Sequence, residues 1–185
     1  KHVQEPKPCH WEGVKRVFRY LKGTASHGLC YAATEQVPAL KIYCDADWET
    51  DPEDRHSRSG VVCYLGNSLV ARTSRRQATP SVSSCEAEYI ALFEAGRDAV
   101  WMRSLLCELD MCPGTVPTQV LHDNQGSIAW AQGSPRKVKH VELKYHHTQH
   151  LIENGQIRIA YVESAMNAAD MMTKALSGQS FHRAL

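Results

Sequence analysis

The sequence lacks any apolar run long enough to cross a membrane, and its first eight residues, KHVQEPKP, contain no apolar stretch like that of a secretory signal. We therefore expect neither a membrane partner nor a signal, although a chain that starts without Met leaves open a signal in a longer precursor. A glycine-rich phosphate loop and a Gly-x-Ser-x-Gly elbow are also missing. These absences argue against a P-loop nucleotidase and an α/β-hydrolase.

Paired cysteines are missing as well. A disulfide framework or a cysteine-rich zinc site needs close pairs such as Cys-x-x-Cys, and the chain has none. The seven cysteines are odd in number and scattered: Cys9, Cys30, Cys44, Cys63, Cys85, Cys107 and Cys112. We expect buried free thiols and a reducing compartment.

Net charge is only +1, so composition alone does not indicate a nucleic-acid partner, but the charges are unevenly distributed. Residues 45–54 carry six acids and no base, and residues 55–76 carry five arginines and no acid. A second basic run covers residues 136–140. Solvated loops would explain these runs, and so would a site that holds cations and lies against phosphates.

Hydrophobic periodicity predicts an α/β domain, a mixed sheet of about five strands flanked by helices. We expect helices over residues 9–22, 84–109, 124–132, 141–153 and 168–176, the last capped by Asn167. We expect strands over residues 40–44, 60–65, 68–73, 116–122 and 156–162, and a short extra strand over residues 28–32. A proline-containing linker at residues 36–38 divides the chain into an appendage (1–36) and a main domain (38–176), followed by a tail (177–185).

Two predicted strands end in an aspartate, Asp45 and Asp123. Sites in α/β sheets gather at the carboxyl ends of strands, whereas an isolated aspartate there is more often part of an ordinary turn. Glu88 shares a helical stripe with apolar residues, where an unpaired charge is costly. Glu86 points elsewhere and suits the helix dipole.

Carboxylates within about 4 Å of one another repel by roughly 4 kcal/mol per pair at an effective dielectric near 20, so such a cluster needs protons or cations. Oxygen ligands favour Mg²⁺ first and Mn²⁺ second, and two such ions can clamp a phosphoryl group in transfer. The rival metal site is a zinc pair, His146 and His150, which lacks a third ligand. We favour a basic, aromatic surface there, and we set aside Ser84 and Cys85 as nucleophiles because no histidine is placed beside them.

Several ordered motifs carry a resemblance to a known family. They are YCDADW from Tyr43, RSG from Arg58, SSCEAEYIAL from Ser83, DNQGSI from Asp123, KHVELKYH from Lys139 and AADMMTK from Ala168. Together they resemble the ribonuclease H domain of copia-type LTR retrotransposon polyproteins. The appendage resembles the tail that links the reverse transcriptase to that domain.

The resemblance implies a ribonuclease H-like fold and an endonuclease that cuts the RNA strand of RNA–DNA hybrids with two Mg²⁺ ions, for which Mn²⁺ can substitute. It implies Asp45, Glu88, Asp123 and Asp170 as catalytic residues and metal ligands; Asp170 rests on the resemblance alone. The implied partners are the hybrid and the reverse transcriptase domain of the same polyprotein. The implied location is the cytoplasm, in a virus-like particle, and also the nucleus.

Substrate contacts are expected from two sets of residues. Ser83, Ser84, Asn124 and Gln125 resemble positions that touch the minor groove, where 2′-hydroxyls distinguish RNA from DNA. The basic stretches offer phosphate contacts through Arg72, Arg75, Arg76, Lys139, His140, Lys144 and His146. The family pattern is incomplete in two places: residues 163–169 have no histidine to aid product release, and Glu142 stands where relatives have Asp.

Two alternatives remain at this stage. One is a non-catalytic nucleic-acid-binding or spacer domain, such as a domesticated copy, against which the presence of all four acids argues. The other is an integrase-like transposase core, in which the catalytic glutamate follows the second aspartate. Here the best candidate, Glu88, precedes Asp123.

Overall fold

The computed structural model describes residues 3–31, 38–48, 55–111, 114–133 and 142–176, together with Gly178 and Phe181. The chain divides into two compact units, Lys1–Tyr31 and Ala32–Leu185. Within the described ranges, every helix is too short or too polar to cross a membrane.

The first unit is built around α1 (Pro8–Gly23), which starts with a proline at its first position and ends where Thr24 bonds back to the Tyr20 carbonyl. None of its residues is buried, and Trp11 and Phe18 are 61% and 65% exposed. The strand predicted over residues 28–32 is wrong for the part described, since residues 28–31 have no regular structure. The unit has no described strand to pair with, and a single strand has no ladder of hydrogen bonds.

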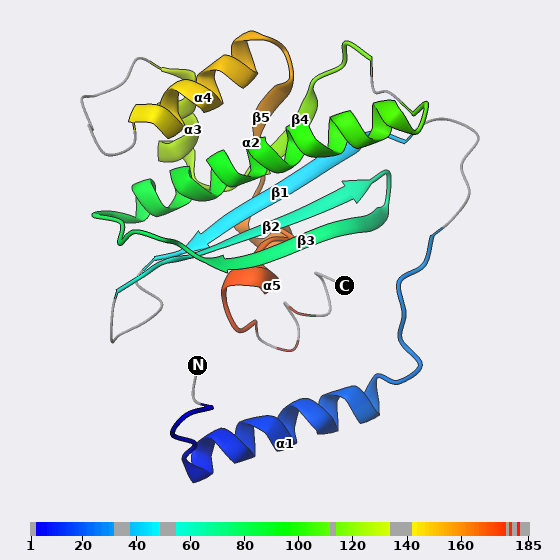
Figure 1. The fold of residues 1–185 in the computed structure, drawn as a ribbon, viewed down its shortest axis with the longest axis vertical. Coiled ribbons are helices and arrows are strands. Elements are labelled where there is room, and N and C mark those ends of the chain that lie inside the picture. Colours follow the sequence, from blue (N-terminus) through cyan, green and yellow to red (C-terminus); the bar gives the residue numbers. More distant parts are fainter. Residues whose placement is uncertain are drawn as a thin grey trace. The chain divides into compact units, whose positions relative to one another are not determined.

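The second unit contains the predicted five-stranded mixed sheet, in the order β3-β2-β1-β4-β5 (Figure 1). Its strands are β1 (Leu40–Asp47), β2 (Arg58–Leu65), β3 (Ser68–Arg76), β4 (Thr118–His122) and β5 (Ile157–Tyr161). The first three form an antiparallel meander that turns at Gly66, where φ is +63°. Strands β4 and β5 run parallel to β1.

Helices lie on both sides of the sheet. They are α2 (Ser84–Glu108), α3 (Gln125–Gln132), α4 (Glu142–Glu153), the 3₁₀ helix η1 (Ser164–Met166) and α5 (Asp170–Thr173). Figure 1 shows α2, α3 and α4 on one side and α5 on the other. Ala91, Ala95 and Ala99 of α2 are fully buried, and these small side chains let the helix sit close to β1.

The predicted closing helix, residues 168–176, is wrong in length: only α5, four residues long, is helical there. Asn167 is not its cap, because α5 begins only at Asp170 and Ala169 occupies the N-cap position. The Nδ2 of Asn167 donates to the Cys44 carbonyl at 3.0 Å, and its Oδ1 accepts from the Ala169 N–H at 3.1 Å. The segment is therefore tied to β1 before the helix begins.

The prediction of buried free thiols is correct for Cys44 and Cys63, Cys85 is free but only half-buried, and Cys112 lies outside the described residues. Cys9 and Cys30 are free but exposed, because they belong to the first unit, where α1 buries nothing. Cys107 is exposed and disulfide-bonded, which contradicts the prediction of a free thiol there.

Candidate active site

The carboxyl ends of β1 and β4 form the centre of the site. The two strands are parallel neighbours whose register pairs Tyr43 with Leu121, so the residues that follow emerge at the same edge. Asp45, Asp123 and Asp170 each offer a carboxylate oxygen, and these three atoms lie within 4.8 Å of one another. Glu88, His122 and Asp123 form a second such group. The four predicted acids therefore meet in one cluster that shares Asp123.

Glu88 reaches the cluster from the second turn of α2. Its Oε2 accepts from the Ala46 N–H at 2.9 Å, and its side chain is 12% exposed. The start of α2 is held firmly: Ser83 caps it, and Gln77 donates to the Ala87 carbonyl at 2.9 Å. Glu86 turns away and accepts from the Val82 N–H at 2.9 Å, which agrees with its predicted helix-start role.

Asp170 is the first residue of α5, and Asp45 lies against the end of that helix and the residue after it. The Thr173 hydroxyl donates to Asp45 Oδ2. The Lys174 ammonium lies 3.0 Å from Asp170 Oδ2 and 3.8 Å from Asp45 Oδ2. Gly60, paired with Asp45 across the sheet, makes room for this segment: a Cβ there would lie 2.8 Å from Thr173 Cγ2 and 2.9 Å from the Ala169 carbonyl oxygen.

Sequence reasoning missed three side chains at this site. Lys174 lies four residues after Asp170, a spacing that could have revealed it. Thr173 is the neighbour of that lysine. His122 has the same strand phase as the buried Thr118 and Val120, so alternation along β4 could have placed it inward.

The site is electrostatically strained without cations. Burial, with the charges of Asp45 and Asp123 adding to it, raises the pKa of Glu88 to about 9. Burial also raises the pKa of Asp170 to about 6 and that of Asp45 above its ordinary value. Asp123 Oδ1 and Asp170 Oδ1 are buried without a hydrogen-bond partner. Orphaned, crowded carboxylate oxygens fit divalent cations, because cation binding supplies both the missing ligand contacts and the missing charge.

The predicted minor-groove residues lie at two helix starts. Ser83 caps α2, and Asn124 caps α3 by accepting from the Ser127 N–H at 2.9 Å. Ser84 and Gln125 are exposed. The two helix starts adjoin, since a Cβ on Gly126 would lie 3.3 Å from Cys85 Sγ.

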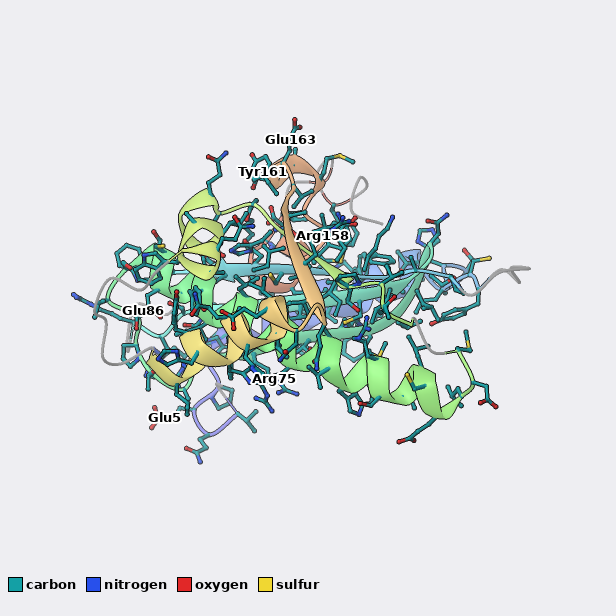
Figure 2. All side chains as sticks on the ribbon, turned by 90° about the horizontal axis from the view of Figure 1, so that it is seen from above. Glu5, Arg75, Glu86, Arg158, Tyr161 and Glu163 are labelled. Atoms are coloured by element: carbon teal, nitrogen blue, oxygen red, sulfur yellow. The ribbon has the colours of Figure 1, made fainter. Side chains whose placement is uncertain are left out.

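The three predicted arginines of β3 lie on two different faces of the sheet. Ser74 donates to the Met172 carbonyl at 2.5 Å, so Arg72 and Arg76, in the same strand phase, share the α5 face. Arg75 lies on the α2 face, where its charge opposes the burial-induced rise in the pKa of Glu94 and of Asp98. Figure 2 shows Arg75 on this edge strand, with Arg158 and Tyr161 on the opposite edge strand, β5.

The second basic stretch is described only in part. Lys139 and His140 lie outside the described residues. Lys144 is half-buried, and its charge acts on Glu94; His146 is exposed beside the Tyr145 ring. Neither of the groups of metal-ligating atoms found in the described ranges includes His146 or His150, so the rival zinc pair has no support there.

Comparison of the sequence with known proteins finds retrotransposon polyproteins. No family model matches the chain. It is 30% identical, over 98% of its length, to a retrovirus-related Pol polyprotein from transposon TNT 1-94 of Nicotiana tabacum, and 33% identical over 98% to that from transposon RE2 of Arabidopsis thaliana. It spans only 14% and 12% of those two proteins.

Solved ribonuclease H structures superpose on the chain at low sequence identity. LC11-RNase H1, isolated from compost, matches with a TM-score of 0.57 at 20% identity, over 74% of this chain and 93% of that one. The same enzyme in complex with an RNA/DNA hybrid matches with a TM-score of 0.54 at 20% identity, over 72% and 93%. These similarities show a ribonuclease H fold and confirm the predicted fold class.

Proposed function

The chain belongs to the retrovirus-related Pol polyproteins of copia-type retrotransposons, as a segment with the ribonuclease H fold, and from this premise we propose that it hydrolyses the RNA strand of RNA–DNA hybrids. One observation carries the proposal: four acids from four separate elements converge on shared positions, with Asp123 common to both groups. The structural relative that was solved with an RNA/DNA hybrid supports this choice of substrate.

Two divalent ions, Mg²⁺ or its substitute Mn²⁺, would be held by Asp45, Glu88, Asp123 and Asp170. Such ions supply stabilisation of the attacking and leaving oxygens in phosphoryl transfer. The protein's own contribution is orientation: the Thr173 hydroxyl holds Asp45, the Ala46 N–H holds Glu88, and Lys174 holds Asp170. Because the pKa of Glu88 is raised to about 9, this carboxyl must lose a proton before it can ligate at neutral pH, whereas Asp170, with a pKa of about 6, is largely ionised there.

A cleavage assay tests the proposal. The substrates are an RNA–DNA hybrid, duplex RNA and duplex DNA, each with Mg²⁺ and with a chelator. We expect cutting of the hybrid's RNA strand alone, only with Mg²⁺ or Mn²⁺, and none by Asp45→Asn. Asp47→Asn, which removes the same charge two residues along β1, should keep activity. Cutting of duplex DNA would favour the integrase-like alternative, and hybrid binding without cutting would favour the non-catalytic one.

The basic edge is proposed to contact the phosphates of the hybrid. Arg58, on the neighbouring strand β2, pairs with Asp47 of β1. Arg75 and Arg76 of β3 pair with Ser59 and Arg58, so they lie two strands away from β1, which is roughly 10 Å. We expect Arg76→Ala to weaken hybrid binding and to lower its salt slope by about one unit. Arg75→Ala should change the slope less, because Arg75 already faces Glu94 and Asp98. Equal slopes in both variants and the wild type would show that neither contacts phosphate.

We also propose a partner for residues 1–36 and a setting in which the domain acts. The chain spans about an eighth of its curated relatives, so the reverse transcriptase domain of a longer polyprotein is the proposed partner of residues 1–36. The exposed apolar side chains of α1 support that role. Residues 38–176 are the proposed ribonuclease H domain, which would act during reverse transcription in cytoplasmic virus-like particles and in the nucleus.

A further inference from the structure

His122 is a buried side chain that the proposed four-acid mechanism does not use. It is the last residue of β4, directly before Asp123, and it is fully buried. A buried imidazole normally has both ring nitrogens satisfied. Here Nε2 has no hydrogen-bond partner among the residues that the structure describes.

The other ring nitrogen fixes the chemistry of Nε2. Nδ1 lies 3.1 Å from the Cys44 carbonyl oxygen, which can only accept, and 3.4 Å from Cys44 Sγ. We assign the proton to Nδ1, because the carbonyl is a far stronger hydrogen-bond partner than the weakly donating thiol. In a neutral imidazole this leaves a bare lone pair on Nε2. Histidines that ligate metals show this arrangement: one nitrogen donates to a backbone carbonyl, and the other faces the ion.

Nε2 is aimed at the acidic cluster. It lies 3.8 Å from Glu88 Oε2, and ligand atoms of Glu88, His122 and Asp123 lie within 4.8 Å of one another. Asp123 Oδ1 is likewise buried without a partner. An unpartnered imidazole nitrogen and oxygens of two carboxylates therefore converge on one position.

We propose that His122 is a nitrogen ligand in the site, so that the position between Glu88, His122 and Asp123 prefers a transition-metal ion such as Mn²⁺ over Mg²⁺. Imidazole binds transition metals better than it binds Mg²⁺, which prefers oxygen ligands. The position between Asp45, Asp123 and Asp170 has oxygen ligands only and keeps the preference for Mg²⁺. This inference rests on the proposed function, since it gives the metal preference of the same site.

The test detects the ligand directly, without nucleic acid. Pulsed electron paramagnetic resonance of Mn²⁺ bound to the full chain should show ¹⁴N modulation, which disappears after labelling with ¹⁵N-histidine. In His122→Asn the amide can still donate to the Cys44 carbonyl, but no atom replaces Nε2. We expect this variant to lose the modulation and to bind Mn²⁺ about ten- to a hundredfold more weakly in calorimetry, with a much smaller change for Mg²⁺.

His147→Asn is the matched control. His147 Nε2 is also buried without a partner, but its ring packs on Phe93 and it belongs to neither acid group. The nitrogen modulation should persist in this variant. Modulation that survives in His122→Asn, or its absence from the wild type, overturns the proposal; the wild-type measurement decides even if His122→Asn does not fold, and His122→Gln then replaces it. A wild-type protein that does not cleave the hybrid in Mg²⁺ would instead contradict the proposed function.

Discussion

The acidic site has two sides that solve the same electrostatic problem differently. On the lysine side, Asp45 and Asp170 are offset by Thr173 and Lys174. On the histidine side, Glu88 and Asp123 face His122, whose pKa is lowered by burial. The pKa of Asp170 rises only to about 6, whereas that of Glu88 rises to about 9. Burial drives both shifts, and the nearby ammonium limits the first far more than the second.

Asp123 belongs to both groups of ligands, so Asp123→Asn should affect both sides of the site at once and have the largest effect. We expect hybrid cleavage to fall to background. The metal-free protein should become more stable by about 1–4 kcal/mol at pH 8, because one of several like charges is gone. Gel assays and thermal unfolding in a chelator measure the two effects. Asp110→Asn, in the exposed turn after α2, should change neither. Undiminished cleavage by Asp123→Asn would contradict the assignment.

Glu88→Gln sharpens the difference in proton binding. The folded pKa of Glu88, about 9, lies above the ordinary 4.5, so the folded state binds a proton that the unfolded state releases. Stability of the metal-free protein should therefore fall as pH rises from about 4.5 to about 9. Glu88→Gln should flatten that fall and raise the melting temperature at pH 9 by several degrees.

Asp170→Asn is the matched variant for this measurement. Its pKa rises from 3.8 to about 6, so the variant should flatten only the acidic part of the profile. Differential scanning fluorimetry across pH, in a chelator, follows both. Identical profiles for Glu88→Gln and the wild type would show that Glu88 titrates normally.

Lys174→Met makes the lysine side resemble the histidine side. Without the ammonium, the pKa of Asp170 should rise further, and the metal-free protein should lose about 1 kcal/mol at pH 8, or roughly 2–4 °C in melting temperature. The side chain is 40% exposed, so solvent screening keeps the effect small. Lys174→Arg keeps the charge and should behave like the wild type. An unchanged melting temperature in Lys174→Met would mean that the ion pair contributes nothing.

The sequence predicted three of the four acids for a physical reason. Asp45 and Asp123 directly follow predicted strands, and Glu88 heads an apolar stripe, so local periodicity identifies all three. Asp170 lies in a four-residue helix that has no period to detect, and only the family resemblance reached it. Its position depends on contacts with β1 and β2 that are far away in sequence.

The order of helices and strands was predictable from the sequence, but the contacts made by individual side chains were not. The strand over residues 68–73 was expected correctly and extends to Arg76, yet the split of its arginines between two faces depends on what covers each face. Likewise, Asn167 has the right chemistry for a helix cap, but its Nδ2 donates to the buried Cys44 carbonyl, and α5 begins three residues later. Local propensity carries no information about a hydrogen-bond partner 123 residues away in the sequence.

The geometry of the site depends on Gly60 as well as on its four acids. The segment that carries α5 packs against Gly60 only because this residue has no side chain, since any Cβ there would clash with Thr173 and the Ala169 carbonyl. A single substitution at Gly60 would therefore displace Asp170 and Lys174 while leaving all four carboxylates in the sequence. The proposed activity therefore depends on more positions than the four acids, and a count of carboxylates alone does not show that a related segment is intact.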